Sequence, residues 1–198
     1  MLVFVKENLA LLSVPKTGST ALEAALAPRA AMVLRDPPQL KHAPLYRFNR
    51  FLRPMFTTAA GTPLQTMALV RHPEDWLGSW YRYRSRDALC GHPNSTKDVS
   101  FDAFVRDYCS AAPSPRANVG SQARFVGYSD SQSGVDHLFR YEAWDKAIRF
   151  LEIRLQAPIK TKKLNVSPRL RLSLTEETRA LLQSACVDEF AVWHAAQH

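Results

Sequence analysis

The stretch from Leu9 to Leu26, LALLSVPKTGSTALEAAL, decides the fold of this chain. It opens with an apolar run that ends at Pro15 and closes with a segment rich in alanine and leucine, which favour helix. Between the two lies the polar hexapeptide PKTGST, residues 15–20. The pattern predicts a strand over 9–14, a tight loop, and a helix over 19–26.

The hexapeptide has the chemistry of an anion site. Backbone N–H groups at a helix N-terminus attract anions, Gly18 lets the backbone approach a ligand, and Ser19 and Thr20 add hydroxyl donors. It is not a Walker A loop, because that motif places glycines before a Lys-Ser/Thr pair and Lys16 here precedes the only glycine. A plain strand-to-helix turn with a solvated lysine is the alternative interpretation.

Two more strand–helix units follow along the chain. The unbroken apolar run 66–70 predicts a strand buried on both faces, and residues 71–73 turn from it into a helix. A third strand is expected over 135–139, followed by a helix over 144–155. This alternation predicts an α/β fold with a central parallel sheet.

Other segments carry weaker signals. Residues 101–109 are typical of a short helix, and Ser173 with Glu176 forms a capping box that predicts a last helix from about Leu174. The Pro-rich or polar stretches 28–65 and 87–131 indicate irregular loops. We expect substrate-binding residues in these loops.

Composition favours one globular domain over residues 1–198. The chain is 46% hydrophobic and 22% charged, which excludes disordered and fibrous classes, and no apolar run reaches the roughly 20 residues of a membrane span. Three widely spaced cysteines, Cys90, Cys109 and Cys186, predict reduced thiols in a cytoplasmic protein and no zinc site. The net charge of +8 favours anionic partners, but without a recognisable nucleic-acid-binding motif we expect no nucleic acid.

A second anion-binding feature follows the 66–70 run. Arg71 stands at the carboxyl end of that strand, where open α/β sheets place their ligands, and Ser79 follows eight residues later on the helix. P-loop NTPases hold magnesium with an aspartate at a comparable strand end. A guanidinium at this place predicts an anion site that needs no metal, although an ion-pair role for Arg71 and a surface role for Ser79 stay open.

Together, the hexapeptide after a strand and Arg71-x-Pro73 with Ser79 resemble the two nucleotide motifs of sulfotransferases that use 3′-phosphoadenosine-5′-phosphosulfate (PAPS). The chain resembles their bacterial and Golgi carbohydrate-type branch over nearly its whole length. It differs in having Ser19 where many relatives carry Thr and Ala21 where many carry Trp. Further likeness lies in Lys41-His42, residues 101–104, Gln122, residues 135–142, residues 165–167 and the last helix.

This resemblance implies a P-loop-like three-layer α/β/α fold and sulfuryl transfer from PAPS to a hydroxyl or amine, such as that of a carbohydrate or small molecule, leaving adenosine 3′,5′-bisphosphate. It further implies that Lys16 contacts the bridging oxygen and the leaving phosphate. By the same resemblance the 5′-phosphate is bound by Thr17, Gly18, Ser19 and Thr20, and the 3′-phosphate by Arg71 and Ser79.

The catalytic base is open between two residues. His42 matches the histidine that follows the first helix in several branches of the family, and a neutral imidazole suits proton abstraction near pH 7. Glu23 on the predicted first helix is the alternative, and we expect His72 to be a structural residue of the turn beside Arg71.

Other residues receive structural interpretations first. Arg47, Arg50 and Arg53 recur at helical spacing and indicate a solvated basic face, with a path for an anionic acceptor as the alternative. Lys160, Lys162 and Lys163 lie in a segment that, by resemblance, folds over the nucleotide. We expect Trp76, Trp80, Phe101 and Phe104 in the core.

Two rival functions remain at this point. A nucleotide-dependent kinase of the same fold is disfavoured by the missing Walker A pattern and by Arg71. A non-catalytic nucleotide-binding module, or an inactive sulfotransferase, shares the binding motifs. The acceptor and the oligomeric state have no readable signal.

Overall fold

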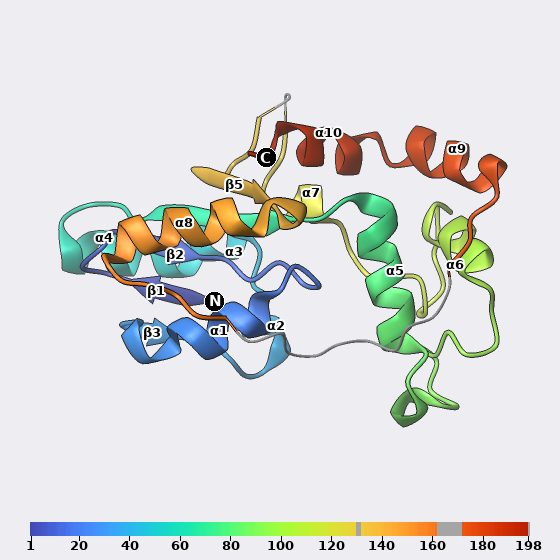
Figure 1. Cartoon of the computed structure of the whole chain (residues 1–198), viewed down its shortest axis with the longest axis horizontal. Coiled ribbons are helices and arrows are strands. Elements are labelled where there is room, and N and C mark those ends of the chain that lie inside the picture. The colour runs from blue at the N-terminus through green and yellow to red at the C-terminus, as the bar shows by residue number, and fades with distance from the viewer. Residues whose placement is uncertain (130–131, 162–171, 198) are drawn as a thin grey trace.

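The strand, loop and helix predicted from residues 9–26 form the centre of the fold. A computed structural model describes residues 1–129, 132–161 and 172–197 (Figure 1). Strand β2 spans Leu9–Leu11, and helix α1 spans Ser19–Leu26. The strand is shorter than predicted, although the Leu12 N–H still donates to the Met67 carbonyl at 2.8 Å.

The expectation of a parallel sheet is confirmed for the three predicted strands at its core but not for the whole sheet, which is mixed. Its order is β3-β1-β2-β4-β5, in which β2, β4 and β5 run parallel while β1 is antiparallel to β2 and β3. Residues 5–8 are too few for a parallel crossover, and Asn8, with φ of 51°, closes a turn between β1 and β2. The additional strands are β1 (Leu2–Phe4), β3 (Met32–Val33), β4 (Gln65–Val70) and β5 (His137–Arg140).

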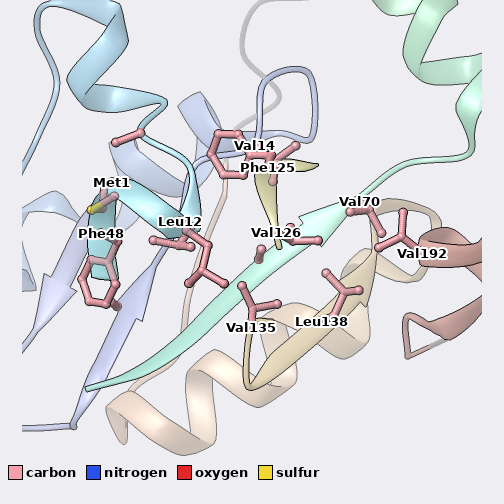
Figure 2. Packing of buried hydrophobic residues seen from close by; sticks show 14 of the residues in the cluster. Met1, Leu12, Val14, Phe48, Val70, Phe125, Val126, Val135, Leu138 and Val192 are labelled. Atoms are coloured by element: carbon pink, nitrogen blue, oxygen red, sulfur yellow. The ribbon is translucent and has the colours of Figure 1, made fainter. Parts of the chain in front are cut away.

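Both faces of the sheet are buried under helices. Along β4, Met67 and Leu69 face one apolar cluster with α1 and α8 (Trp144–Leu155), while Ala68 and Val70 face the other. The second cluster brings Val70 against Val192 of α10 (Val187–Ala195), and Val126 and Leu138 pack nearby (Figure 2). This burial confirms the prediction that the 66–70 run is a strand covered on both sides.

Much of the stretch 28–65, predicted to be irregular, is helical. Leu45, Phe48 and Phe56 are buried at helical spacing against the sheet, so apolar periodicity prevails over the scattered prolines. The prolines of the helices in this segment lie at or before a first turn, where a missing N–H costs nothing. The segment contains η1 (Ala27–Arg29), α2 (Pro38–Lys41), α3 (Leu45–Arg47), the π-helical turn η2 (Phe48–Leu52) and α4 (Arg53–Ala60).

A third apolar cluster lies beyond the end of the sheet. In Figure 1, α5, α6 and α9 stand together away from the strands, and Trp76, Leu77, Phe104 and Leu182 are buried between them. None of the helices in the described ranges has both the length and the apolar character of a membrane span. The bounds are α5 (Pro73–Arg84), η3 (Asp87–Leu89), α6 (Phe101–Tyr108), α7 (Gln122–Phe125), η4 (Tyr141–Ala143) and α9 (Glu176–Ala185).

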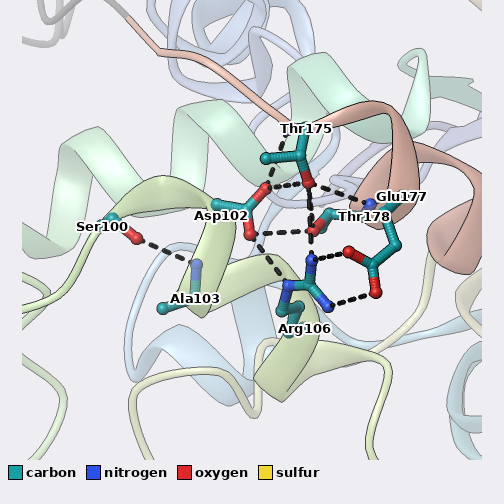
Figure 3. A network of polar contacts seen from close by, with 7 residues as sticks. All are labelled: Ser100, Asp102, Ala103, Arg106, Thr175, Glu177 and Thr178. Atoms are coloured by element: carbon teal, nitrogen blue, oxygen red, sulfur yellow. Dashed lines mark hydrogen bonds and ion pairs between the residues drawn. The ribbon is translucent and has the colours of Figure 1, made fainter.

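The predicted capping box at Ser173 is wrong, because α9 begins two residues later. Thr175 is the N-cap, and its hydroxyl accepts from the Thr178 N–H at 3.2 Å (Figure 3). The Asp102 carboxylate of α6 fixes this start, since it accepts from the Thr175 N–H at 2.9 Å and from Arg106 Nε at 2.9 Å. These hydrogen bonds, above all the one from Thr175, hold the pKa of Asp102 well below its usual range.

Candidate anion-binding site

The loop between β2 and α1 adopts a backbone suited to an anion. Lys16 and Gly18 both take left-handed conformations, with φ of 67° and 76°. Gly18 is the N-cap of α1 and supplies no side-chain cap, so the first N–H groups of the helix, at Ser19 and Thr20, have no side-chain acceptor at the cap. The Thr17 hydroxyl donates to the Val14 carbonyl at 2.9 Å, which holds the loop against the end of the strand.

Two aromatic residues from the junction between β5 and α8 close over Gly18. A Cβ atom at this position would lie 2.5 Å from the Trp144 ring and 3.2 Å from Tyr141 Cε2. Only glycine fits both the left-handed backbone and this close approach. The packing fixes the loop between the β5–α8 junction and helix α5, whose Trp76 Nε1 donates to the Pro15 carbonyl at 2.9 Å.

The Lys16 side chain lies in a cationic and aromatic cluster on α5. Its Nζ is 3.3 Å from the centroid of the Tyr83 ring and 4.6 Å from that of Trp80. Arg84 stacks near the same Trp80 ring, and Arg86 near the Tyr83 ring. Burial, followed by the charges of Arg86 and Arg84, lowers the pKa of Lys16 to about 7.

No carboxylate of the described residues forms an ion pair with these three cations. The Arg84 guanidinium donates instead to backbone carbonyls, including Pro115 O at 2.8 Å. A cluster of positive charge with lowered lysine basicity gains stability when an anion binds. We therefore regard the outer side of the loop as the candidate site.

Arg71 lies at the end of β4, as predicted, and borders the same site. Its guanidinium carbon is 4.8 Å from the centroid of Tyr141, the ring that also contacts Gly18. The Gln122 side chain fixes the Arg71 backbone by accepting from its N–H at 2.8 Å and donating to its carbonyl at 2.9 Å. Arg71 Nε is buried without a hydrogen-bond partner among the described residues.

Ser79 is placed less closely. It lies half-buried on α5, one turn after Trp76 and next to Trp80. The described residues show no contact between its hydroxyl and Arg71. Arg71 therefore lies next to the loop, because Tyr141 contacts both Arg71 and Gly18. Ser79 lies on α5, the helix whose Trp80 and Tyr83 contact Lys16.

His42 lies beside the start of the loop. Its Nδ1 is 2.6 Å from the Ser13 carbonyl, a distance that requires Nδ1 to carry the hydrogen and leaves the Nε2 lone pair available in the neutral ring. Burial lowers the pKa of His42, the Ser13 hydrogen bond partly opposes this, and the charges of Lys41, the N-terminus and Lys16 lower it further. The imidazole is therefore neutral at pH 7 and able to accept a proton.

Glu23, the alternative base, is engaged in ion pairs. Its carboxylate lies 2.5 Å from Arg35 Nε and 2.9 Å from Lys41 Nζ. Burial alone would raise the pKa of Glu23, but the hydrogen bonds from Lys41 and Arg35 outweigh it, and the pKa lies below its usual value. This arrangement favours a structural role that holds Lys41 next to His42.

The other residues given a structural interpretation from the sequence are His72 and four aromatic side chains expected in the core. His72 packs edge-on against Trp193 at 4.8 Å and Phe190 at 5.7 Å, in agreement with a structural role. Trp76, Phe101 and Phe104 are core residues, whereas Trp80 is only partly buried and contacts Lys16.

The basic residues outside the loop show no common site within the described ranges. Arg47 and Arg50 are exposed, and Arg53 donates to the Leu64 carbonyl at 3.0 Å. Lys160 is exposed, while Lys162, Lys163 and residues 165–167 lie outside the described residues. In the part of the chain that the structure describes, no group of three or more His, Cys, Asp or Glu side chains is arranged to hold a metal ion.

Sequence reasoning missed the aromatic residues and arginines that surround the loop. Tyr141 and Trp144 are predicted only as parts of the third unit, and the alternation of aromatic and basic residues in YRYR, 81–84, is the available signal for the α5 cluster. The larger surface hollows lie elsewhere, at about 760 Å³ beside Phe150 and about 440 Å³ beside Tyr108. Beneath the loop is a hollow of only about 10 Å³, which is too small for a phosphate group.

Comparisons of this chain with protein-family models, with curated proteins and with solved structures gave no match.

Proposed function

We propose that this chain is a PAPS-dependent sulfotransferase with a P-loop-like three-layer α/β/α fold. The observation that carries the proposal is the pair Lys16 and Arg71, two cations without carboxylate partners among the described residues, on either side of an uncapped helix N-terminus. This combination suits a ligand with two separated anionic groups. PAPS has a phosphosulfate at one end of its ribose and a phosphate at the other.

The residues present fit the donor nucleotide. The N–H groups of the first α1 turn, with the Ser19 and Thr20 hydroxyls, would bind the 5′-phosphosulfate, and the Arg71 guanidinium would donate to the 3′-phosphate. Ser79 on α5 would complete the 3′-phosphate site. Each of these groups is a donor, as an all-oxygen anion requires.

Lys16 has the central chemical role in this proposal. Sulfuryl transfer forms a bond between the acceptor oxygen and sulfur and breaks the bond between sulfur and the 5′-phosphate oxygen, which keeps the electron pair. That oxygen gains negative charge in the transition state, and a protonated Lys16 beside it compensates this charge. A bound anion raises the lysine pKa above its value of about 7 in the free protein, so the charged form is present when it is needed.

His42 removes the proton that the acceptor loses. The Ser13 carbonyl holds Nδ1–H and thereby orients Nε2 as the accepting nitrogen. Because the pKa of His42 is lowered, the ring is neutral and unprotonated before the reaction. The imidazolium that forms returns its proton to water after the sulfated product leaves.

The test is transfer of labelled sulfuryl from PAPS to a panel of glycans, phenols and lipids, with release of adenosine 3′,5′-bisphosphate as a second readout. We expect transfer by the wild type, and loss of transfer in Lys16→Ala and His42→Ala. Lys6→Ala, which removes an exposed lysine from a distant turn, is the matched control and should keep full activity. Phosphoryl transfer from ATP in place of sulfuryl transfer would establish the kinase alternative and overturn the proposal.

A further inference from the structure

Two of the three cysteines meet across the third apolar cluster. Cys109 follows the last turn of α6, Cys186 forms the corner between α9 and α10, and their sulfur atoms are 4.0 Å apart although 77 positions separate them in sequence. A disulfide bond is about 2.05 Å long, so the two sulfurs need to approach by about 2 Å to form one. The third cysteine, Cys90, is exposed and lies elsewhere.

Small molecules can reach this pair. Cys109 and Cys186 are both half-buried, and both line the surface hollow of about 440 Å³ together with Tyr108 and Glu189. Buried structural cysteines are inert because reagents cannot contact their sulfur. An open hollow beside two adjacent thiols removes that barrier.

The two sulfur atoms differ in their readiness to react. The hydrogen bond between them lowers the pKa of Cys109 and raises that of Cys186, whose burial and proximity to Glu189 raise it further. The thiolate is the nucleophile in thiol–disulfide exchange. Cys109 is therefore the attacking sulfur, and Cys186 the one that resolves the mixed disulfide.

The pair also adjoins the residues that hold Arg71. One turn after Cys186, the Glu189 carboxylate accepts from the Gln122 N–H at 3.1 Å and from the Ser121 hydroxyl. Gln122 in turn clamps the Arg71 backbone. A covalent tie at the α9–α10 corner thus acts on the element that positions one cation of the candidate site.

We propose that Cys109 and Cys186 form a thiol–disulfide exchange site that takes small disulfides such as oxidised glutathione. The Cys109 thiolate attacks one glutathione sulfur, forms a mixed disulfide and releases the first glutathione thiolate. The Cys186 thiolate then attacks the Cys109 sulfur, forms the intramolecular disulfide and releases the second glutathione. Two protein thiols are oxidised, one glutathione disulfide is reduced to two thiols, and the two protons pass to the released glutathiones.

The experiment uses the full chain carrying Cys90→Ser, which removes the exposed thiol and leaves the pair intact. After incubation with oxidised glutathione, the expected product has lost two hydrogen atoms in mass, has no titratable thiol, and yields one cross-linked peptide joining residues 109 and 186. Its melting temperature should exceed that of the reduced form by about 5 °C or more, because the bond closes a long loop. Reduction with dithiothreitol should reverse both changes.

Single variants in the same background distinguish the two roles. Adding Cys186→Ser should leave Cys109 as a stable mixed disulfide with glutathione. In the protein with Cys109→Ser, Cys186 should react with oxidised glutathione at least tenfold more slowly than Cys109 does in the Cys186→Ser protein. The proposal is overturned if the Cys90→Ser protein keeps both thiols free, or if each thiol carries its own glutathione with no cross-linked peptide. Both of these outcomes are measured on a protein in which the pair is unmutated, so they hold even where a single variant folds poorly.

Discussion

Binding of adenosine 3′,5′-bisphosphate should draw a proton onto Lys16. The pKa of this lysine is lowered to about 7 in the free protein, mainly by burial, and a neighbouring phosphate restores it toward the ordinary value near 10.5. At pH 8 the free lysine is only about one-tenth protonated and the bound lysine is fully protonated, so binding takes up about 0.9 proton. At pH 7 the uptake is about 0.5 proton.

The same linkage sets the pH dependence of affinity. Binding should weaken about fivefold between pH 7 and pH 8, and nearly tenfold, or about 1.3 kcal/mol, between pH 8 and pH 9, because the free protein must first gain a proton. The ligand itself does not cause this trend, since the second pKa of a phosphate ester is near 6 and its phosphates are fully ionised at pH 8. The stability of the free protein should have the opposite pH dependence to the affinity. Between about pH 7 and pH 9 the unfolded chain binds more protons than the folded one, because Lys16 has its ordinary pKa when unfolded, so the free energy of unfolding rises with pH.

Titration calorimetry at pH 8 in two buffers of different ionisation enthalpy measures the uptake directly. Lys16→Arg is the matched control, because arginine keeps its charge at every accessible pH and should abolish both the uptake and the pH trend. An uptake below about 0.2 proton in the wild type would refute the reasoning. So would an equal uptake in Lys16→Arg, because the proton would then belong to another group.

Four other results are expected. Gly18→Ala should lower the melting temperature more than Gly61→Ala does, since both glycines have φ near 75° but only Gly18 would drive a Cβ to 2.5 Å from Trp144; equal losses in thermal melts would contradict that packing. His42→Ala should reduce turnover by roughly 10²- to 10⁴-fold with unchanged bisphosphate affinity. It should also remove the acidic limb of the pH–rate profile, which lies below about pH 6.5 because the pKa of His42 is lowered. Near-normal turnover in this variant would place the base elsewhere. Activity should survive EDTA, because Lys16 supplies the charge that a metal would otherwise provide, and a strict need for a divalent cation would contradict this. Asp102→Asn should lower the free energy of unfolding, measured with urea at pH 7, by about 1.5–3 kcal/mol. The difference from the wild type should shrink below about pH 4, because a carboxyl group with a lowered pKa stabilises the fold only while it is ionised. A difference that stays constant down to pH 2 would be the contrary result.

The parallel part of the fold could be predicted from local sequence, because each strand–helix unit contains residues that mark where its elements begin or end. Pro73, which opens the helix after the second apolar run, is the first residue of α5, whereas strand β2 already ends at Leu11, four residues before Pro15. The antiparallel strands were missed because Leu2–Phe4 and Met32–Val33 are too short for a periodic signal. The pairing of β1 with β3 joins residues about 30 positions apart, so it leaves no signal in a short stretch of sequence.

The candidate site shows the same limit. The positions of the loop and of Arg71 could be predicted because the ends of a strand and the start of a helix are marked in the local sequence. The contact of Trp144 with Gly18 could not, since it joins residues 126 positions apart through the packing of α8 on the sheet. The start of α9 was misplaced for a similar reason, because the partner that selects Thr175 over Ser173 is Asp102 on another helix.

The most direct test of the central claim compares two ligands in two proteins. Adenosine 3′,5′-bisphosphate and adenosine 5′-monophosphate differ only in the 3′-phosphate that we assign to Arg71. In the wild type the bisphosphate should bind about 10- to 150-fold more tightly by calorimetry, which corresponds to a charge-assisted contact of about 1.5–3 kcal/mol. In Arg71→Ala the two ligands should bind within about threefold of each other, while the exposed control Arg50→Ala should keep the full wild-type preference. A preference that persists undiminished in Arg71→Ala, or that is absent from the wild type, would contradict the assignment of this site to a 3′-phosphorylated nucleotide.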